Sequence, residues 1–185
     1  MVELIATGRP MKQAPFFFPR PLRLALLIDA ENMSWTCCEP VMKLAAERGH
    51  LLIRRAYADW TNPHVASWRK VLEANVIRPV QQFHYRHGKN ASDSALIMDM
   101  MEMLLAPQRK VDGFCIVSSD SDYTGVVTRA READVPVYGF GRQDAAKSFV
   151  AACNGFAFLD HGADDRHDAA RSPSASYSDP PAQFS

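Results

Sequence analysis

The sequence predicts an α/β protein with three layers, in which a mainly parallel central sheet is covered by helices on both faces. Short apolar runs alternate with longer segments of helical periodicity between residues 22 and 160, and no internal repeat is present. The first run, residues 22–28, has no polar alternation after Arg23, which is typical of a strand buried on both faces. With 47% hydrophobic and 23% charged residues in a chain of 185, the composition suits one globular domain.

Each element follows from its local pattern. The apolar runs predict strands at residues 22–28, 51–57, 76–83, 114–117, 135–140 and 156–159. Pro79 weakens the third of these, because proline cannot donate a hydrogen bond within a sheet. The segments between the strands predict helices at residues 38–48, 63–74, 92–105, 123–133 and about 144–152. The helix at 92–105 has the clearest pattern: Ser92 can cap it, and apolar residues recur at spacings of three and four.

The two ends of the chain differ from this pattern. Residues 1–21 hold four prolines around an aromatic triplet at 16–18, which predicts an N-terminal arm without regular structure. Residues 161–185 are rich in Gly, Asp, Ser, Pro and Ala, which predicts a disordered C-terminal tail. The predicted domain therefore spans residues 22–160.

Charge and cysteine content limit the partners and the compartment. The 21 basic and 21 acidic residues cancel, so binding to a nucleic acid would need a local basic patch. The four cysteines form neither a CxxC pair nor a disulfide framework, which favours a reducing, cytoplasmic location. The N-terminal apolar stretch is broken by charges and prolines, so we expect neither a signal peptide nor association with a membrane.

Carboxylates stand at the predicted carboxyl ends of the strands. Asp29 ends the first strand, Asp93 opens the helix at 92–105, and Asp120 and Asp122 follow the strand at 114–117. Each has a structural alternative as a helix cap, a first-turn carboxylate or part of a capped turn. Four carboxylates meeting at one edge would repel one another, and Mg²⁺ or Mn²⁺ would relieve that repulsion. We therefore predict a metal site at this edge.

Asp99 lies six residues after Asp93, which places it about 120° away around a helix. We therefore do not count Asp99 among the expected ligands. Flanking methionines indicate that it is instead buried and hydrogen-bonded.

Four segments carry a recognisable combination of motifs: LIDAEN at 27–32, GKNASDSAL at 88–96 with Asp99 after it, DGFCIVSSDSDY at 112–123 and VYGFG at 137–141. Together they resemble the NYN domains of the LabA-like branch of the PIN-like superfamily. The resemblance implies a PIN-like Rossmannoid fold and a ribonuclease site that depends on a metal. It assigns the acidic positions to Asp29, Asp93, Asp120 and Asp122, the strand-one asparagine to Asn32 and the small residue before the acidic pair to Ser119.

The sequence departs from the family pattern in three places. Glu31 stands where aspartate is frequent, and Ser94 replaces a residue that is usually apolar. Many bacterial relatives add an RNA-binding domain of the OST-HTH/LOTUS type, whereas this sequence has a short tail at that position. Substrate selection would then fall to the NYN domain or to a separate RNA-binding partner protein, and a homodimer is also left open.

Basic residues precede Asp93 in the segment 84–90. Arg86 and Lys89 are the candidates for contact with an RNA phosphate, and Lys89 is the preferred one. His84 and His87 lack the further histidine or cysteine that a zinc site needs.

The predicted function is a Mg²⁺- or Mn²⁺-dependent endoribonuclease that acts as a phosphodiester hydrolase. Asp29, Asp93, Asp120 and Asp122 would hold the metal, and Asn32, Ser119, Lys89 and Arg86 would position water or RNA. Water activated by the metal would attack phosphorus in line with the departing 3′ oxygen. Two alternatives stay open: a non-catalytic RNA-binding regulatory module, and a metal-dependent phosphatase that acts on a small phosphoester.

Overall fold

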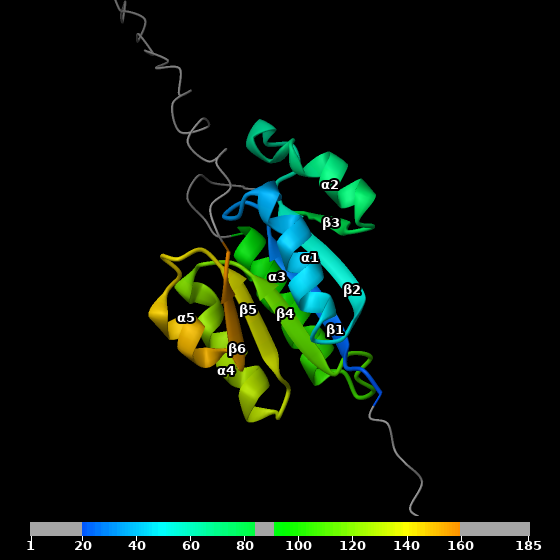
Figure 1. Ribbon diagram of the computed structural model, residues 1–185, viewed down its shortest axis with the longest axis vertical. Coiled ribbons are helices and arrows are strands. Elements are labelled where there is room, and N and C mark those ends of the chain that lie inside the picture. The colour runs from blue at the N-terminus through cyan, green and yellow to red at the C-terminus, as the bar shows by residue number, and fades with distance from the viewer. Residues whose placement is uncertain (1–19, 84–90, 160–185) are drawn as a thin grey trace, which may run out of the picture.

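The computed structural model of the chain describes residues 20–83 and 91–159, and it centres on a six-stranded parallel sheet (Figure 1). The spatial order β3-β2-β1-β4-β5-β6 places β1 and β4 side by side in the middle. The strands are β1 (Arg23–Asp29), β2 (His50–Ala58), β3 (Arg78–Gln81), β4 (Gly113–Val117), β5 (Val137–Gly141) and β6 (Gly155–Phe158). Every pairing between neighbours is parallel, which confirms the predicted type of sheet.

Helices cover both faces of the sheet. They are α1 (Cys38–Ala46), α2 (Trp68–Ala74), α3 (Ala91–Leu105), α4 (Thr124–Glu132) and α5 (Lys147–Ala152), with short 3₁₀ turns η1 (Trp35–Cys37), η2 (Pro63–Val65) and η3 (Ser121–Tyr123). Side chains of β1 alternate between the two layers. Leu24, Leu26 and Ile28 pack in one core with α1 and α2, whereas Ala25 and Leu27 pack in the other with α3, α4 and α5. The predicted three-layer α/β/α architecture is therefore confirmed.

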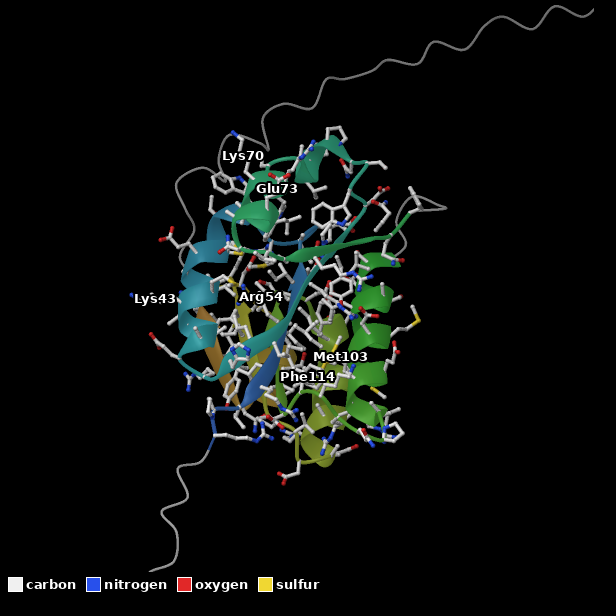
Figure 2. The ribbon with its side chains drawn as sticks, turned by 90° about the vertical axis from the view of Figure 1, so that its right-hand side faces the viewer. Lys43, Arg54, Lys70, Glu73, Met103 and Phe114 are labelled. Atoms are coloured by element: carbon white, nitrogen blue, oxygen red, sulfur yellow. The ribbon has the colours of Figure 1, made fainter. Side chains whose placement is uncertain are left out.

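Figure 2 shows these layers from the side of the sheet. Lys43 of α1 points away from the sheet on one side, and Met103 belongs to α3 on the opposite side. Phe114 of β4 lies between them, in the core that α3 covers. α1 thus turns Lys43 to solvent, whereas α3 buries Leu96, Met100 and Leu104 against the core and leaves Met98 and Leu105 exposed.

The order of the strands reverses direction between β1 and β4. From β1 the chain moves outward to β2 and β3, and it then returns to add β4, β5 and β6 on the other side. In open parallel sheets, ligands bind outside the carboxyl ends of the strands at such a switch point. The carboxyl ends of β1 and β4 are therefore the place at which to look for a functional site.

Some predicted elements are divided or shorter in the structure. The helix predicted at 63–74 is split into η2 and α2, and the one predicted at 123–133 begins as η3 before α4. The strand predicted at 76–83 pairs only over Arg78–Gln81, at the edge of the sheet, where Pro79 is best tolerated.

The start of α3 corrects one expectation. The helix already includes Ala91, so Ser92 lies inside it and does not cap it. The predicted apolar face is largely right, since Leu96, Met100 and Leu104 are buried, but Leu105 is 68% exposed.

Other expectations depend on chain segments or cysteines. Residues 1–19 and 160–185, which contain most of the predicted arm and tail, lie outside the described residues. No helix in the described part of the chain combines the length and apolar character needed to cross a bilayer. The four cysteines, Cys37, Cys38, Cys115 and Cys153, are all free thiols, in agreement with the prediction of no disulfide framework.

Candidate functional site

Asp29 ends β1 and is fully buried. Its Oδ2 accepts hydrogen bonds from Asn32 Nδ2 at 2.9 Å and from Ser118 Oγ at 2.9 Å, and its Oδ1 accepts one from Asn32 N at 3.3 Å. The bond from Asn32 N closes a tight turn, but the first helical residue comes only at Trp35, so Asp29 is not a helix cap. The turn fixes the carboxylate at the edge of the sheet.

Burial raises the pKa of Asp29 to about 6. The hydrogen bonds from Asn32 and Ser118 oppose this rise, because they stabilise the charged form, while repulsion from Asp93 adds to it. An aspartate with such a pKa is partly protonated at neutral to mildly acidic pH. A cation shared with a second carboxylate would favour the charged form of Asp29.

Asp93 lies in the first turn of α3 and is only 5% exposed. The Tyr123 hydroxyl donates a hydrogen bond to Asp93 Oδ1 at 2.5 Å. Burial raises the pKa of Asp93, the bond from Tyr123 lowers it, and repulsion from Asp120, Asp122 and Glu31 raises it further. Asp93 is therefore within electrostatic reach of the other three predicted acidic residues, Asp29, Asp120 and Asp122.

Tyr123 was not predicted as part of the site, yet it lies between the two buried carboxylates. Its pKa is raised above the usual range, first by burial and then by the nearby charge of Asp29 and the hydrogen bond to Asp93. It therefore stays protonated and acts as a hydrogen-bond donor that orients Asp93. Its position directly after Asp122 in the chain was the only signal that the sequence offered.

Asp120 and Asp122 both follow β4. Asp120 directly precedes the turn η3, and Asp122 lies within it. Asp120 Oδ1 accepts a hydrogen bond from Asp122 N at 3.0 Å, so the capped-turn interpretation of Asp120 is correct. Ser118 connects this turn to β1, because its hydroxyl donates to Asp29 and accepts from Asp120 N at 3.2 Å. One buried serine thus joins the ends of the two central strands.

Glu31 is a further acidic residue at this edge, and its pattern in the sequence predicted no role for it in the site. Its Oε2 accepts a hydrogen bond from Ser92 Oγ at 2.7 Å, and its Oε1 accepts one from Asp59 N at 2.8 Å. These contacts connect the turn after β1 to α3 and to the end of β2. The hydroxyl that was expected to cap α3 instead positions a carboxylate.

Asn32 and Ser119, the two predicted positioning residues, line a hollow of about 320 Å³ with Asp120 and Arg142. The Asn32 amide is engaged with Asp29, and Ser119 Oγ accepts a hydrogen bond from Arg142 N at 2.9 Å. Both side chains therefore shape the site, and the hollow offers space beside Asp120.

Other candidates lie elsewhere. Asp99 is on α3 but accepts hydrogen bonds from Arg55 and from the Tyr57 hydroxyl, so it belongs to a separate ion pair, as its spacing from Asp93 predicted. It is hydrogen-bonded as expected, but its side chain is 25% exposed, so the prediction that it is buried was wrong. Arg86 and Lys89, with His84 and His87, fall outside the described residues.

A divalent cation at this edge of the sheet would need several ligand side chains close together. Among residues 20–83 and 91–159, no three His, Cys, Asp or Glu side chains lie close enough to form a metal site as they stand. The carboxylates supply only oxygen donors, which suits Mg²⁺ or Mn²⁺. Among the ion pairs of the described residues, none joins a Lys or Arg to Asp29 or Asp93. In type, the donors present fit a divalent cation.

Comparisons with known proteins identify the family of the chain and a structure with a similar fold. The family model described as the NYN domain matches residues 23–160, which is most of the chain. The fold is similar to the crystal structure of a protein of unknown function, VPA0982, from Vibrio parahaemolyticus, with a TM-score of 0.61 and 19% identity over 77% of this chain and 95% of that one. MurG from Acinetobacter baumannii has a TM-score of 0.45 and 14% identity over 72% of this chain and 40% of its own. A search of curated proteins finds no match to the sequence.

Proposed function

This chain belongs to the NYN domain family, part of the PIN-like nuclease superfamily, and from that membership we propose that it is a metal-dependent ribonuclease. The observation that supports the proposal most is the meeting of two buried carboxylates, Asp29 and Asp93, with the more exposed Asp120 and Asp122 at the switch point of the sheet. Burial raises the pKa of Asp93 and of Asp29; repulsion from Asp120 and Asp122 adds to the first shift, and repulsion from Asp93 adds to the second. Carboxylates that are desolvated and repel one another are typical of a cation site.

In this proposal Asp29, Asp93, Asp120 and Asp122 would hold Mg²⁺ or Mn²⁺. The ion would polarise the phosphodiester and lower the pKa of the attacking water. The chain's own residues prepare the site: Asn32 and Ser118 fix the Asp29 carboxylate by three hydrogen bonds, and the Tyr123 hydroxyl fixes Asp93.

The finer assignments are also part of the proposal. RNA as the substrate, the LabA-like branch and a cytoplasmic location follow from the resemblance and from the free cysteines. Arg86 and Lys89 would contact RNA from the segment before α3. A homodimer or a separate RNA-binding partner protein would add to substrate selection.

One observation favours the regulatory alternative. In the described part of the chain no three potential ligands form a metal site as they stand, and Asp29 is already hydrogen-bonded by neighbouring residues. A module that binds RNA without cutting it would need no closer approach of these carboxylates. It should bind RNA equally well in EDTA.

The deciding experiment is cleavage of a labelled mixed-sequence RNA with Mn²⁺ or Mg²⁺ and with EDTA. The wild type is compared with Asp29→Asn and Asp120→Asn. Asp134→Asn is the matched control: Asp134 is exposed, lies outside the site and has a φ of 55°, which asparagine tolerates. We expect cleavage that needs the metal, persists in the control and disappears in both site variants.

Each other result has a defined meaning. Equal product from all four proteins would indicate a contaminating nuclease. Binding without cleavage would favour the regulatory module. Hydrolysis of a chromogenic phosphoester, with RNA left intact, would favour the phosphatase.

A further inference from the structure

Arg142 lines the hollow beside Asp120. It has no role in the proposal above. It directly follows β5, and its backbone N donates a hydrogen bond to Ser119 Oγ at 2.9 Å. Its Nη1 donates to the carbonyl oxygen of Asn32 at 2.6 Å. The side chain therefore reaches from the end of β5, past the turn after β4, to the turn after β1.

Close packing under this residue fixes its position. A Cβ atom on Gly141 would lie 2.4 Å from the carbonyl oxygen of Ser118 and 3.1 Å from Ser119 Oγ. Only glycine lets the end of β5 approach the turn after β4 so closely. Arg142 is thereby held beside Asp120, which follows in that turn.

The guanidinium has one edge available for a ligand. Nη1 is bonded to Asn32, whereas Nε donates to Asp144 Oδ1 at 3.1 Å and Nη2 donates to no described residue. The edge formed by Nε and Nη2 is one that can bind phosphate through two parallel hydrogen bonds. Asp144 occupies only half of it.

The contact with Asp144 is easily exchanged. The side chains of Arg142 and Asp144 are 36% and 69% exposed, and exposed ion pairs contribute little to stability. Arg142, Asp144 and Asp120 line the same hollow of about 320 Å³, together with the hydroxyl residues Ser119 and Ser121. A phosphate that entered the hollow would meet the guanidinium and two hydroxyls, of which Ser119 Oγ now donates to Met33 Sδ and Ser121 Oγ to Asp120 Oδ1.

We propose that Arg142 forms a subsite for a backbone phosphate of RNA beside the acidic cluster, and that Asp144 covers its phosphate-binding edge when RNA is absent. The inference rests on the proposed function for the identity of the ligand. It supplies the local positive charge that a chain with no net charge needs in order to hold a polyanion.

Equilibrium binding of a labelled single-stranded RNA tests the subsite. Binding is measured at several salt concentrations, in EDTA and in Ca²⁺, and the intact length of the RNA is verified on a gel. We expect Arg142→Gln to weaken binding about tenfold and to reduce the salt slope by about 0.7, the loss of one phosphate contact. Arg142→Lys should keep the slope but bind less tightly, because an ammonium group cannot form the paired contact.

Asp144→Asn gives the opposite and more specific expectation. Freeing the guanidinium edge should tighten binding by about threefold. The matched control is Arg129→Gln, since Arg129 is an exposed arginine of α4 that pairs with Glu132 in a similar way. That control should bind as the wild type does, and thermal unfolding of every variant reports its folding.

The outcomes separate the subsite from the nuclease activity. An unchanged salt slope in folded Arg142→Gln overturns the subsite, while metal-dependent cleavage by the wild type would leave the nuclease intact. The expected binding pattern without any cleavage supports the subsite and counts against the nuclease. A wild type that binds no RNA at low salt in either EDTA or Ca²⁺ overturns the subsite.

Discussion

Aspartates at the two ends of the central sheet have pKa shifts in opposite directions. At the amino end, Asp112 accepts hydrogen bonds from Arg20 at 2.9 and 3.0 Å and from Arg23 at 2.9 to 3.1 Å, and its pKa is held well below the usual range, first by Arg23. At the carboxyl end, burial raises the pKa of both Asp29 and Asp93. Arginines of the chain neutralise Asp112 at the amino end, whereas repulsion between carboxylates adds to the pKa shifts at the carboxyl end.

The comparison shows what separates a structural carboxylate from a functional one. Both ends hold conformations that depend on carboxylate hydrogen bonds, so hydrogen bonding alone does not identify a site. The difference lies in the sign of the nearby charge and in the depth of burial. Each prediction below changes an aspartate at one end of the sheet. The first three use an aspartate at the other end as the reference.

The largest effect is expected on catalysis. Asp93→Asn should lower kcat for RNA cleavage by about a thousandfold or more, because it removes a carboxylate proposed to hold the metal. Asp112→Asn should leave kcat unchanged, since Asp112 lies at the other end of the sheet. Steady-state kinetics at 25 °C, on protein shown to be folded, measures both. Equal losses in the two variants would remove the functional distinction between the ends.

The second effect is a pH dependence of stability with opposite signs at the two ends. The folded pKa of Asp29, about 6, exceeds its unfolded value of about 4, so its contribution is complete below pH 4 and is lost as the pH rises to 6. That loss is roughly 3 kcal/mol. The pKa of Asp112 is lowered, so its contribution is present above about pH 4 and is lost as the pH falls further.

Urea unfolding in EDTA between pH 3 and pH 8 measures this dependence. The wild type should be most stable near pH 4. Asp29→Asn should reduce the slope of the limb between pH 4 and pH 6 and preserve the acid limb, while Asp93, whose pKa is also raised, keeps part of that slope. Asp112→Asn should instead reduce the acid limb and preserve the other. A slope that is unchanged in its own variant would contradict the assignment.

A third effect follows from metal binding. Mn²⁺ at about a hundred times its dissociation constant should stabilise the wild type by about 2.7 kcal/mol at pH 7.5, because it binds the folded state alone. Asp29→Asn should lose most of this stabilisation, whereas Asp112→Asn should keep it. Thermal unfolding across a Mn²⁺ titration gives the measurement. Equal stabilisation of all three proteins would indicate a metal site elsewhere.

The smallest effect is expected at the amino end. Asp112→Asn should lower the free energy of unfolding at pH 7 by about 1 kcal/mol, because it removes the charge that both arginines share. Glu132→Gln is the control, since it breaks an exposed pair with Arg129 and should change almost nothing. Urea unfolding of both variants makes the comparison. A larger loss of unfolding free energy in the control would show that solvent exposure does not determine how much these ion pairs contribute to stability.

Much of the carboxyl end was predictable because it depends on topology. Asp29 and Asp120 follow apolar runs, and the parallel order of those runs places their carboxyl ends at one edge. The amphipathic period of α3 placed Asp93 in its first turn and separated Asp99 from it. These inferences needed only the order and period of the pattern.

The remaining contacts depend on how elements meet in space. Ser92 has the right chemistry for a cap, but its hydroxyl faces Glu31, which is 61 residues away in the sequence. Arg142 reaches Asn32 across 110 residues, and this approach depends on the packing of Gly141 against Ser118. A local pattern carries no information about such distances.

The central position of β1 has a consequence for the order of protein synthesis. Asp29 is made early, but its partner Ser118 follows 89 residues later, directly after β4, the strand that completes the middle of the sheet. A nascent chain emerges from the ribosome amino end first and folds as its domain becomes complete. The acidic cluster therefore cannot assemble until most of the domain has been translated, so a truncated chain that ends before β4 would lack the site altogether.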